Sequence, residues 1–108
     1  MNREIVKTKY LIKNQIKNCK VYHPIIVTQH FVERMVERNI CPLKLSHLLN
    51  FAISRYSFSI IYDKTFSFKY KNEFIVVGEF KEDKYVLKTV LSSYMKPETC
   101  FNKILKPV

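Results

Sequence analysis

Hydrophobic positions recur with a helical period over the first half of the chain. Residues 2–20 carry apolar side chains at spacings that predict an amphipathic helix with a strongly basic outer face. Residues 21–27 predict a short extended segment, and residues 28–39 predict a second helix that begins with Thr28 as its N-cap. The apolar residues of this second helix form a face that can sit on a core: Phe31, Val32, Met35 and Val36.

A third helix is predicted to begin at Pro42, because proline is well suited to the first turn of a helix, and to end near Ser54. Its apolar side is wide, and we expect it to pack on a sheet. The residues that form this side are Leu43, Leu45, Leu48, Leu49, Ala52 and Ile53.

After Arg55 the period of the pattern changes from helical to two, which predicts β-strands. Four strands are expected, at residues 58–62, 66–70, 74–80 and 85–93, with short polar turns between them. The third of these is apolar on both faces, which indicates a central strand. The chain is therefore predicted to be an α+β domain, with N-terminal helices packed on a roughly four-stranded antiparallel sheet.

The alternation in the last strand predicts which residues share a face. Leu87, Thr89 and Leu91 are expected on one side of the sheet, and Lys88 and Val90 on the other. The length fits a single domain over residues 1–108. Within it we distinguish a basic helical extension (residues 1–24), a core (25–95) and a C-terminal tail (96–108).

Charge changes the picture from a generic domain to one suited to polyanions. Lys and Arg outnumber Asp and Glu by 19 to 9, and the net charge of +10 favours nucleic acid as the partner. A lysine excess can also arise from an AT-rich coding sequence, without selection for binding. Only four of the nineteen basic residues are arginine, however, and two of these, Arg34 and Arg38, lie on the second helix. This indicates a need for bidentate contacts there.

Several classes of function are disfavoured by the sequence. No apolar run approaches the roughly 18 residues that a membrane span requires, so we expect no membrane association. Three cysteines without paired spacing fit a reducing, cytoplasmic environment. Cys41 and His47 are too isolated for a zinc site, and the single Gly78 cannot form a glycine-rich phosphate loop. We therefore expect neither a metal nor a cofactor.

The second helix carries the candidate chemistry. His30, Arg34 and Arg38 are four residues apart, so they form one stripe along the helix beside its apolar face. An imidazole and two guanidiniums in a row suit the binding and cleavage of a phosphodiester. The alternative is a surface helix whose arginines pair with Glu33 and Glu37.

This stripe and the strands behind it resemble small domains of the barnase, EndoU, colicin and RelE superfamily of ribonucleases. The resemblance covers about residues 25–95 and rests on order and spacing. The residues that carry it are Thr28, His30, Arg34, Met35, Arg38 and Ile40 on the helix and Lys88, Thr89 and Val90 on the last strand.

The resemblance implies a RelE- or barnase-like fold and a toxin-like, metal-independent endoribonuclease that acts on tRNA or mRNA. The RNA 2′-OH would attack the adjacent phosphate and leave a 2′,3′-cyclic phosphate. His30 would then transfer protons, Arg34 and Arg38 would hold phosphate oxygens, Thr89 would donate a hydrogen bond, and Tyr94 could act as the general acid. No second histidine occupies a matching strand position. A cognate protein inhibitor is a further partner to expect.

Lysines on other elements could extend the contact with RNA: Lys69, Lys71 and Lys88 near the strands, and Lys13 and Lys17 on the first helix. That first helix could equally lie on an acidic partner or be a solvated surface. The competing hypothesis for the whole chain is a non-catalytic regulator, for example phage-encoded, that binds nucleic acid or a host protein on the same scaffold.

Overall fold

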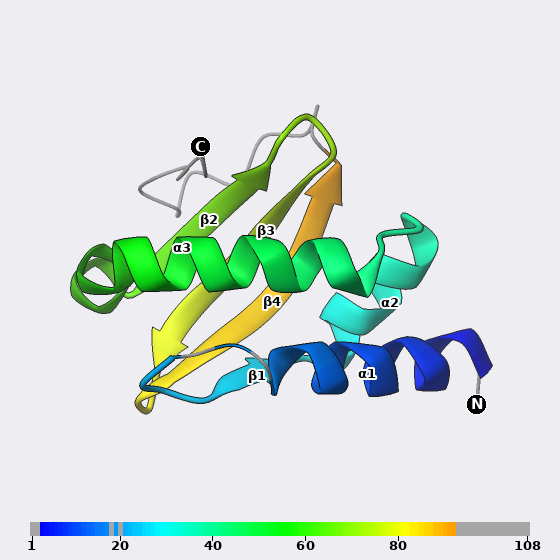
Figure 1. Ribbon diagram of the computed structural model, residues 1–108, viewed down its shortest axis with the longest axis horizontal. Coiled ribbons are helices and arrows are strands. Elements are labelled where there is room, and N and C mark those ends of the chain that lie inside the picture. The colour runs from blue at the N-terminus through cyan, green and yellow to red at the C-terminus, as the bar shows by residue number, and fades with distance from the viewer. Residues whose placement is uncertain (1–2, 18, 20, 93–108) are drawn as a thin grey trace.

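The computed structural model describes residues 3–17, 19 and 21–92, and the fold is α+β, as predicted (Figure 1). Within these residues, three helices are combined with one four-stranded sheet. In chain order the elements are α1 (Arg3–Ile16), β1 (Ile25–Val27), α2 (Gln29–Glu37), α3 (Pro42–Asp63), β2 (Thr65–Tyr70), β3 (Phe74–Lys81) and β4 (Lys84–Ser92).

The sheet is mixed rather than purely antiparallel. Its strand order is β1-β4-β3-β2, so β3 lies between two neighbours, as the both-sided apolar pattern predicted. Strands β2, β3 and β4 form an antiparallel meander. The fourth strand is β1, which pairs in parallel with β4 through Ile25 and Tyr85. The sequence had indicated only an extended segment there.

The strand predicted at residues 58–62 is wrong, because α3 continues as a helix to Asp63. Its backbone departs from helical geometry at Tyr56 (φ −113°, ψ 19°), close to where the hydrophobic period changes. Beyond this kink Ile60 is buried, whereas Phe58 and Tyr62 are 90% and 86% exposed. The alternation that suggested a strand is thus produced by two aromatic side chains on the outer surface of a helix.

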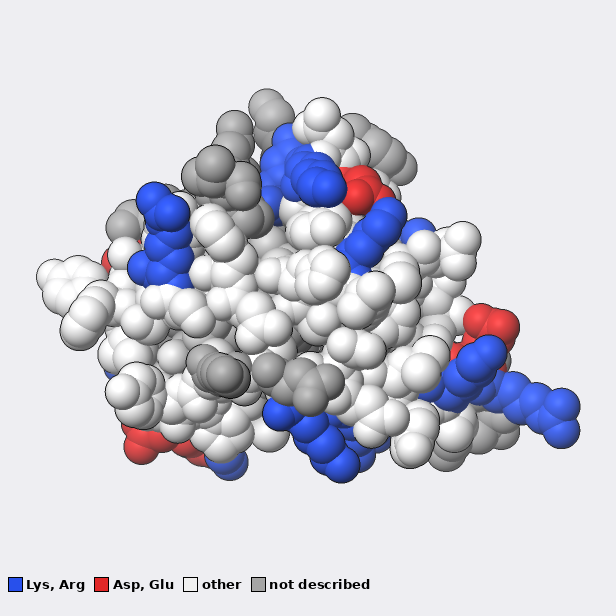
Figure 2. All heavy atoms as spheres, viewed as in Figure 1, with Lys and Arg blue, Asp and Glu red and all other residues white. Residues whose placement is uncertain are grey.

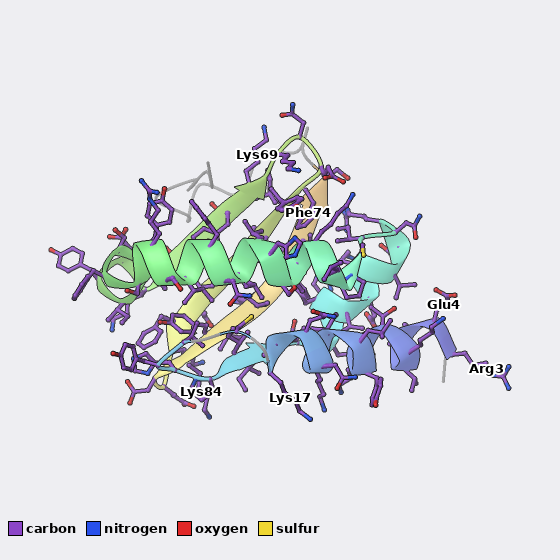
Figure 3. All side chains as sticks on the ribbon, viewed as in Figure 1. Arg3, Glu4, Lys17, Lys69, Phe74 and Lys84 are labelled. Atoms are coloured by element: carbon purple, nitrogen blue, oxygen red, sulfur yellow. The ribbon has the colours of Figure 1, made fainter. Side chains whose placement is uncertain are left out.

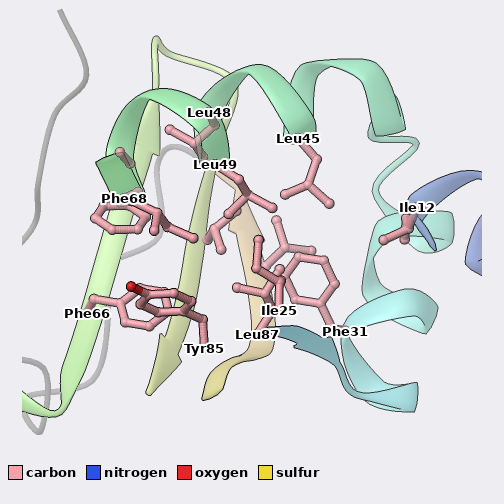
Figure 4. Packing of buried hydrophobic residues seen from close by; sticks show 14 of the residues in the cluster. Ile12, Ile25, Phe31, Leu45, Leu48, Leu49, Phe66, Phe68, Tyr85 and Leu87 are labelled. Atoms are coloured by element: carbon pink, nitrogen blue, oxygen red, sulfur yellow. The ribbon is translucent and has the colours of Figure 1, made fainter. Parts of the chain in front are cut away.

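The helices cover one face of the sheet and enclose the core with it (Figure 1). Helix α3 crosses this face and buries five of the six residues of the apolar side that was predicted to pack on a sheet, whereas Leu43 is 50% exposed. Helix α1 contributes Ile12 to the same cluster. Figure 4 shows side chains from α2, α3 and the strands meeting there: Phe31, Leu45, Leu48, Leu49, Phe66, Phe68, Tyr85 and Leu87.

A β-bulge interrupts the pairing of β3 with β4. Val77 pairs with Thr89 and Gly78 pairs with Leu87, which leaves Lys88 as an extra residue in β4. Leu87 and Val90 consequently both belong to the core, and Thr89 lies on the opposite face with Val77. The prediction that Thr89 shares a face with Leu87 is therefore wrong, because one inserted residue reverses the alternation.

Gly78 sits at this bulge, where the chain has no room for a side chain. A Cβ atom on Gly78 would lie 2.5 Å from the carbonyl oxygen of Val86 and 2.5 Å from Cζ of Phe66. The ring of Phe66, which is opposite Gly78 in β2, fills the space that a side chain would otherwise take.

Within the described part of the chain, none of the helices has the length and hydropathy needed to span a bilayer.

Candidate functional site

The start of α2 is fixed to the bulge of β4 by Thr28. As predicted, Thr28 is the N-cap: its Oγ1 accepts a hydrogen bond from the backbone N–H of Phe31 at 3.1 Å. The same hydroxyl donates to the carbonyl oxygen of Lys88 at 3.1 Å. In addition, the backbone N–H of Thr28 donates to the carbonyl of Leu87 at 3.2 Å. These bonds set the first turn of α2 beside residues 87–89.

A cavity of about 420 Å³ lies at this junction, and we call it the junction cavity. Its lining residues are Thr28, His30, Val77, Lys88 and Thr89. The structure thus brings together three of the candidate residues, one from the first turn of α2 and two from the bulged strand. His30 and Lys88 are exposed, and Thr89 is half-buried. The bulge is needed for this arrangement, because regular alternation would turn Thr89 toward the core.

A carboxylate stands close to Lys88. Oε1 of Glu79 lies 3.7 Å from the Lys88 Nζ. Glu79 is two residues beyond Val77 on β3, so both face the same side of the sheet. The sequence analysis missed Glu79. The available signal was a single acidic residue within an otherwise apolar central strand.

The two arginines of the predicted stripe do not line the junction cavity. A helix rises 1.5 Å per residue, so Arg34 and Arg38 are displaced from His30 by roughly 6 and 12 Å along α2. Nη1 of Arg34 lies 2.6 Å from Oε2 of Glu37, the kind of pair that the alternative interpretation expected. Arg38 terminates α2, and its backbone N–H donates to the carbonyl of Arg34 at 3.0 Å.

None of the remaining candidate lysines lines the junction cavity. Lys69 is on β2, and Lys71 is in the following turn with its Nζ 5.4 Å from the ring centroid of Tyr70. Lys13 and Lys17 belong to the α1 end of the molecule, and Figure 3 shows Lys17 and Lys69 at opposite sides of it. Figure 2 shows Lys and Arg side chains at several separate places on the face that α3 covers. Tyr94 lies outside the described residues.

In the part of the chain that the structure describes, no group of three or more His, Cys, Asp or Glu side chains could hold a metal ion.

Comparisons with protein-family models, with curated proteins and with solved structures find no match for this chain.

Proposed function

We propose that this protein is a metal-independent endoribonuclease whose active site is the junction cavity. The observation that supports the proposal most directly is that His30, Lys88 and Thr89 surround one cavity although two different elements supply them. These are an imidazole, an ammonium and a hydroxyl, which together can transfer a proton, offset negative charge and donate a hydrogen bond to phosphate.

In the proposed reaction the 2′-oxygen of the RNA forms a bond to phosphorus, and the bond from phosphorus to the 5′-oxygen breaks. His30 removes the 2′-OH proton as the general base. Lys88 and Thr89 contact the non-bridging oxygens, on which charge accumulates in the transition state. The 5′-oxygen must receive a proton, and Tyr94 is the residue that the resemblance implies for this step. The products are a 2′,3′-cyclic phosphate and a free 5′-OH.

A second candidate function is binding of RNA phosphate without cleavage. The observation that favours it is the composition of the cavity lining. Of the five described residues that line it, only His30 is of a type that ordinarily titrates near neutral pH. A site with one such group can hold a phosphate between Lys88 and Thr89 and still lack a second proton-transfer group.

The test uses purified full-length protein in EDTA with end-labelled tRNA and mRNA fragments. General acid–base catalysis contributes about 10²- to 10⁴-fold, so His30→Ala should slow cleavage by at least about 100-fold. His47→Ala is the matched control, because His47 is an exposed histidine on α3 that does not line the cavity. A substrate with a 2′-deoxy nucleotide at the cut site should resist cleavage, and mass spectrometry should find cyclic phosphate at the new 3′ ends.

Two results separate the candidates. If the wild-type protein leaves every RNA intact, the proposed ribonuclease activity is contradicted. If the same protein binds RNA, and Lys88→Gln lowers the slope of log affinity against log salt by about one, phosphate binding at this cavity is supported instead. If wild type, His30→Ala and His47→Ala all cleave RNA equally, the cleavage comes from a contaminating nuclease. That result would also contradict the proposed activity.

A further inference from the structure

A larger cavity, of about 460 Å³, lies between α1 and β1 and shares no lining residue with the junction cavity. We call it the α1–β1 groove. Its walls are aliphatic: Ile12, Ile16, Ile25, Ile26 and Val27. Its remaining lining residues are Lys9, Lys13 and Lys17, and Figure 3 shows Lys17 at the end of α1 beside β1.

The groove continues along α1 into a second cavity of about 310 Å³, which Lys9 and Lys13 also line. Val6 and Tyr10 contribute exposed apolar surface to this second part, and Ile26 contributes it to the first. Apolar surface therefore extends along the whole of α1 with basic side chains beside it. Among the described residues, none forms an ion pair with Lys9, Lys13 or Lys17.

Strand β1 also offers unused backbone groups at the groove. Among the described residues it is one of the two edge strands of the sheet, with β4 as its one neighbour. The carbonyl of Pro24 accepts from the N–H of Tyr85 at 2.9 Å, and the N–H of Thr28 donates to Leu87 at 3.2 Å, so residues 24 and 28 point toward β4. Backbone groups of alternate residues in a strand point to the same edge, so the N–H and C=O of Ile26 also point toward β4. The N–H and C=O of Ile25 and Val27 therefore point to the opposite, open edge.

The spacing of the lysines matches an extended chain. Lys9, Lys13 and Lys17 are four residues apart, and the backbone N–H of Lys17 still donates to the carbonyl of Lys13 at 3.2 Å, which continues the helical geometry. Successive lysines are thus roughly 6 Å apart along α1, from the helical rise per residue. Side chains on one side of a β-strand recur about every 6.6 Å. Three lysines can therefore meet three acidic residues at alternate positions of one strand.

We propose that the α1–β1 groove binds an acidic, extended segment of another protein, which adds to the sheet as a fifth strand next to β1. Its backbone pairs with the outward groups of Ile25 and Val27. Carboxylates at every second position meet the lysine row, and aliphatic side chains between them cover the apolar groove. This inference does not depend on the proposed ribonuclease activity, since the two sites share no residue.

Single-stranded RNA is the competing polyanion, and the lining of the groove favours a peptide. Non-specific sites for single strands combine basic residues with aromatic side chains on which bases stack. The 460 Å³ part of the groove has aliphatic walls and no aromatic lining residue among those described. A nucleic-acid backbone also cannot use the free amide and carbonyl groups of an edge strand as a ladder, whereas a peptide can.

The probe is a nine-residue fluorescein-labelled peptide of alternating Glu and Val, measured by fluorescence polarisation at 150 mM salt. The variant that tests the lysine row replaces Lys9, Lys13 and Lys17 by Gln. The matched control replaces Lys7, Lys81 and Lys84 by Gln, which removes the same charge from exposed positions outside the groove. We expect a loss of about tenfold or more in affinity for the first variant and little change for the second.

Strand pairing is tested separately from charge. Two further peptides, one N-methylated at the Val amides and one at the Glu amides, keep every side chain and each lose the donors of one strand edge, so one of the two should bind about tenfold more weakly or worse. Val27→Pro removes the outward N–H and leaves the bonds to β4 in place, so it should weaken binding without loss of the folded state by circular dichroism.

The proposal is overturned if the alternating peptide does not bind wild type, if both triple variants lose affinity equally, or if both N-methylated peptides bind as well as their parent. A labelled oligouridylate is run in parallel. If the oligouridylate binds, loses affinity only in the groove variant, and the peptide does not bind, the groove is a nucleic-acid track and the proposed partner is wrong.

Discussion

Replacing Thr28 by Ala should lower the free energy of unfolding, because the Thr28 hydroxyl makes two hydrogen bonds. The substitution removes the N-cap acceptor for the Phe31 N–H and the donor to the Lys88 carbonyl. Loss of an N-cap costs about 1 kcal/mol. A typical hydrogen bond contributes about 1 kcal/mol, and the one to Lys88 is solvent-exposed, so water can replace part of it. We expect a loss of about 1.5 kcal/mol in the free energy of unfolding.

Urea unfolding followed by circular dichroism measures this loss, and a fall in melting temperature of roughly 6 °C should accompany it for a domain of this size. Thr28→Ser keeps both bonds and should stay close to wild type. Thr28→Asp keeps the acceptor but removes the donor, so it should fall between Ser and Ala. If the Thr28→Ala and Thr28→Ser variants unfold at the same urea concentration, the Thr28 hydroxyl does not stabilise the fold as expected.

Two further predictions concern the sheet. Gly78→Ala should destabilise by about 1–3 kcal/mol in the same urea assay, because the new Cβ meets the backbone carbonyl of Val86, and adding Phe66→Leu should recover only part of the loss. Burial raises the pKa of Tyr85 above its ordinary value of 10.0. The stability this provides is complete below about pH 10 and is lost as pH rises through the folded-state pKa. Tyr85→Phe should therefore show a shallower decline in unfolding free energy between pH 9 and 11, and an identical decline would contradict the effect.

The parts of the fold that follow from local pattern were predictable. Helix α2 and its Thr28 cap follow from helical spacing and cap chemistry, and the apolar runs identify β2, β3 and β4. The end of α3 was not predictable from its own residues, because Phe58 and Tyr62 alternate like strand residues yet are four apart and share the outer side of a helix. Only packing against the sheet distinguishes these interpretations.

Some members of the candidate site were predicted from the sequence, but their arrangement was not. His30 lies on α2, as the helical pattern predicted, but the rise of the helix displaces Arg34 and Arg38 from the first turn, where His30 lies. The faces of Lys88 and Thr89 depend on a bulge, and a bulge depends on pairing with Val77 and Gly78, which one strand cannot reveal. The pairing of Lys88 with Glu79 likewise requires knowledge of the register.

The parallel pairing of β1 with β4 has a consequence for how the protein is made. The Thr28 hydroxyl and the Lys88 carbonyl that it contacts are 60 residues apart, so forming the junction cavity closes a long loop of the chain. Contacts of such sequence separation form slowly and late relative to local helices. During synthesis α1, α2 and α3 can all leave the ribosome before β4 exists. Because Lys88 and Thr89 of β4 line the junction cavity, the cavity cannot form before β4 has been synthesised.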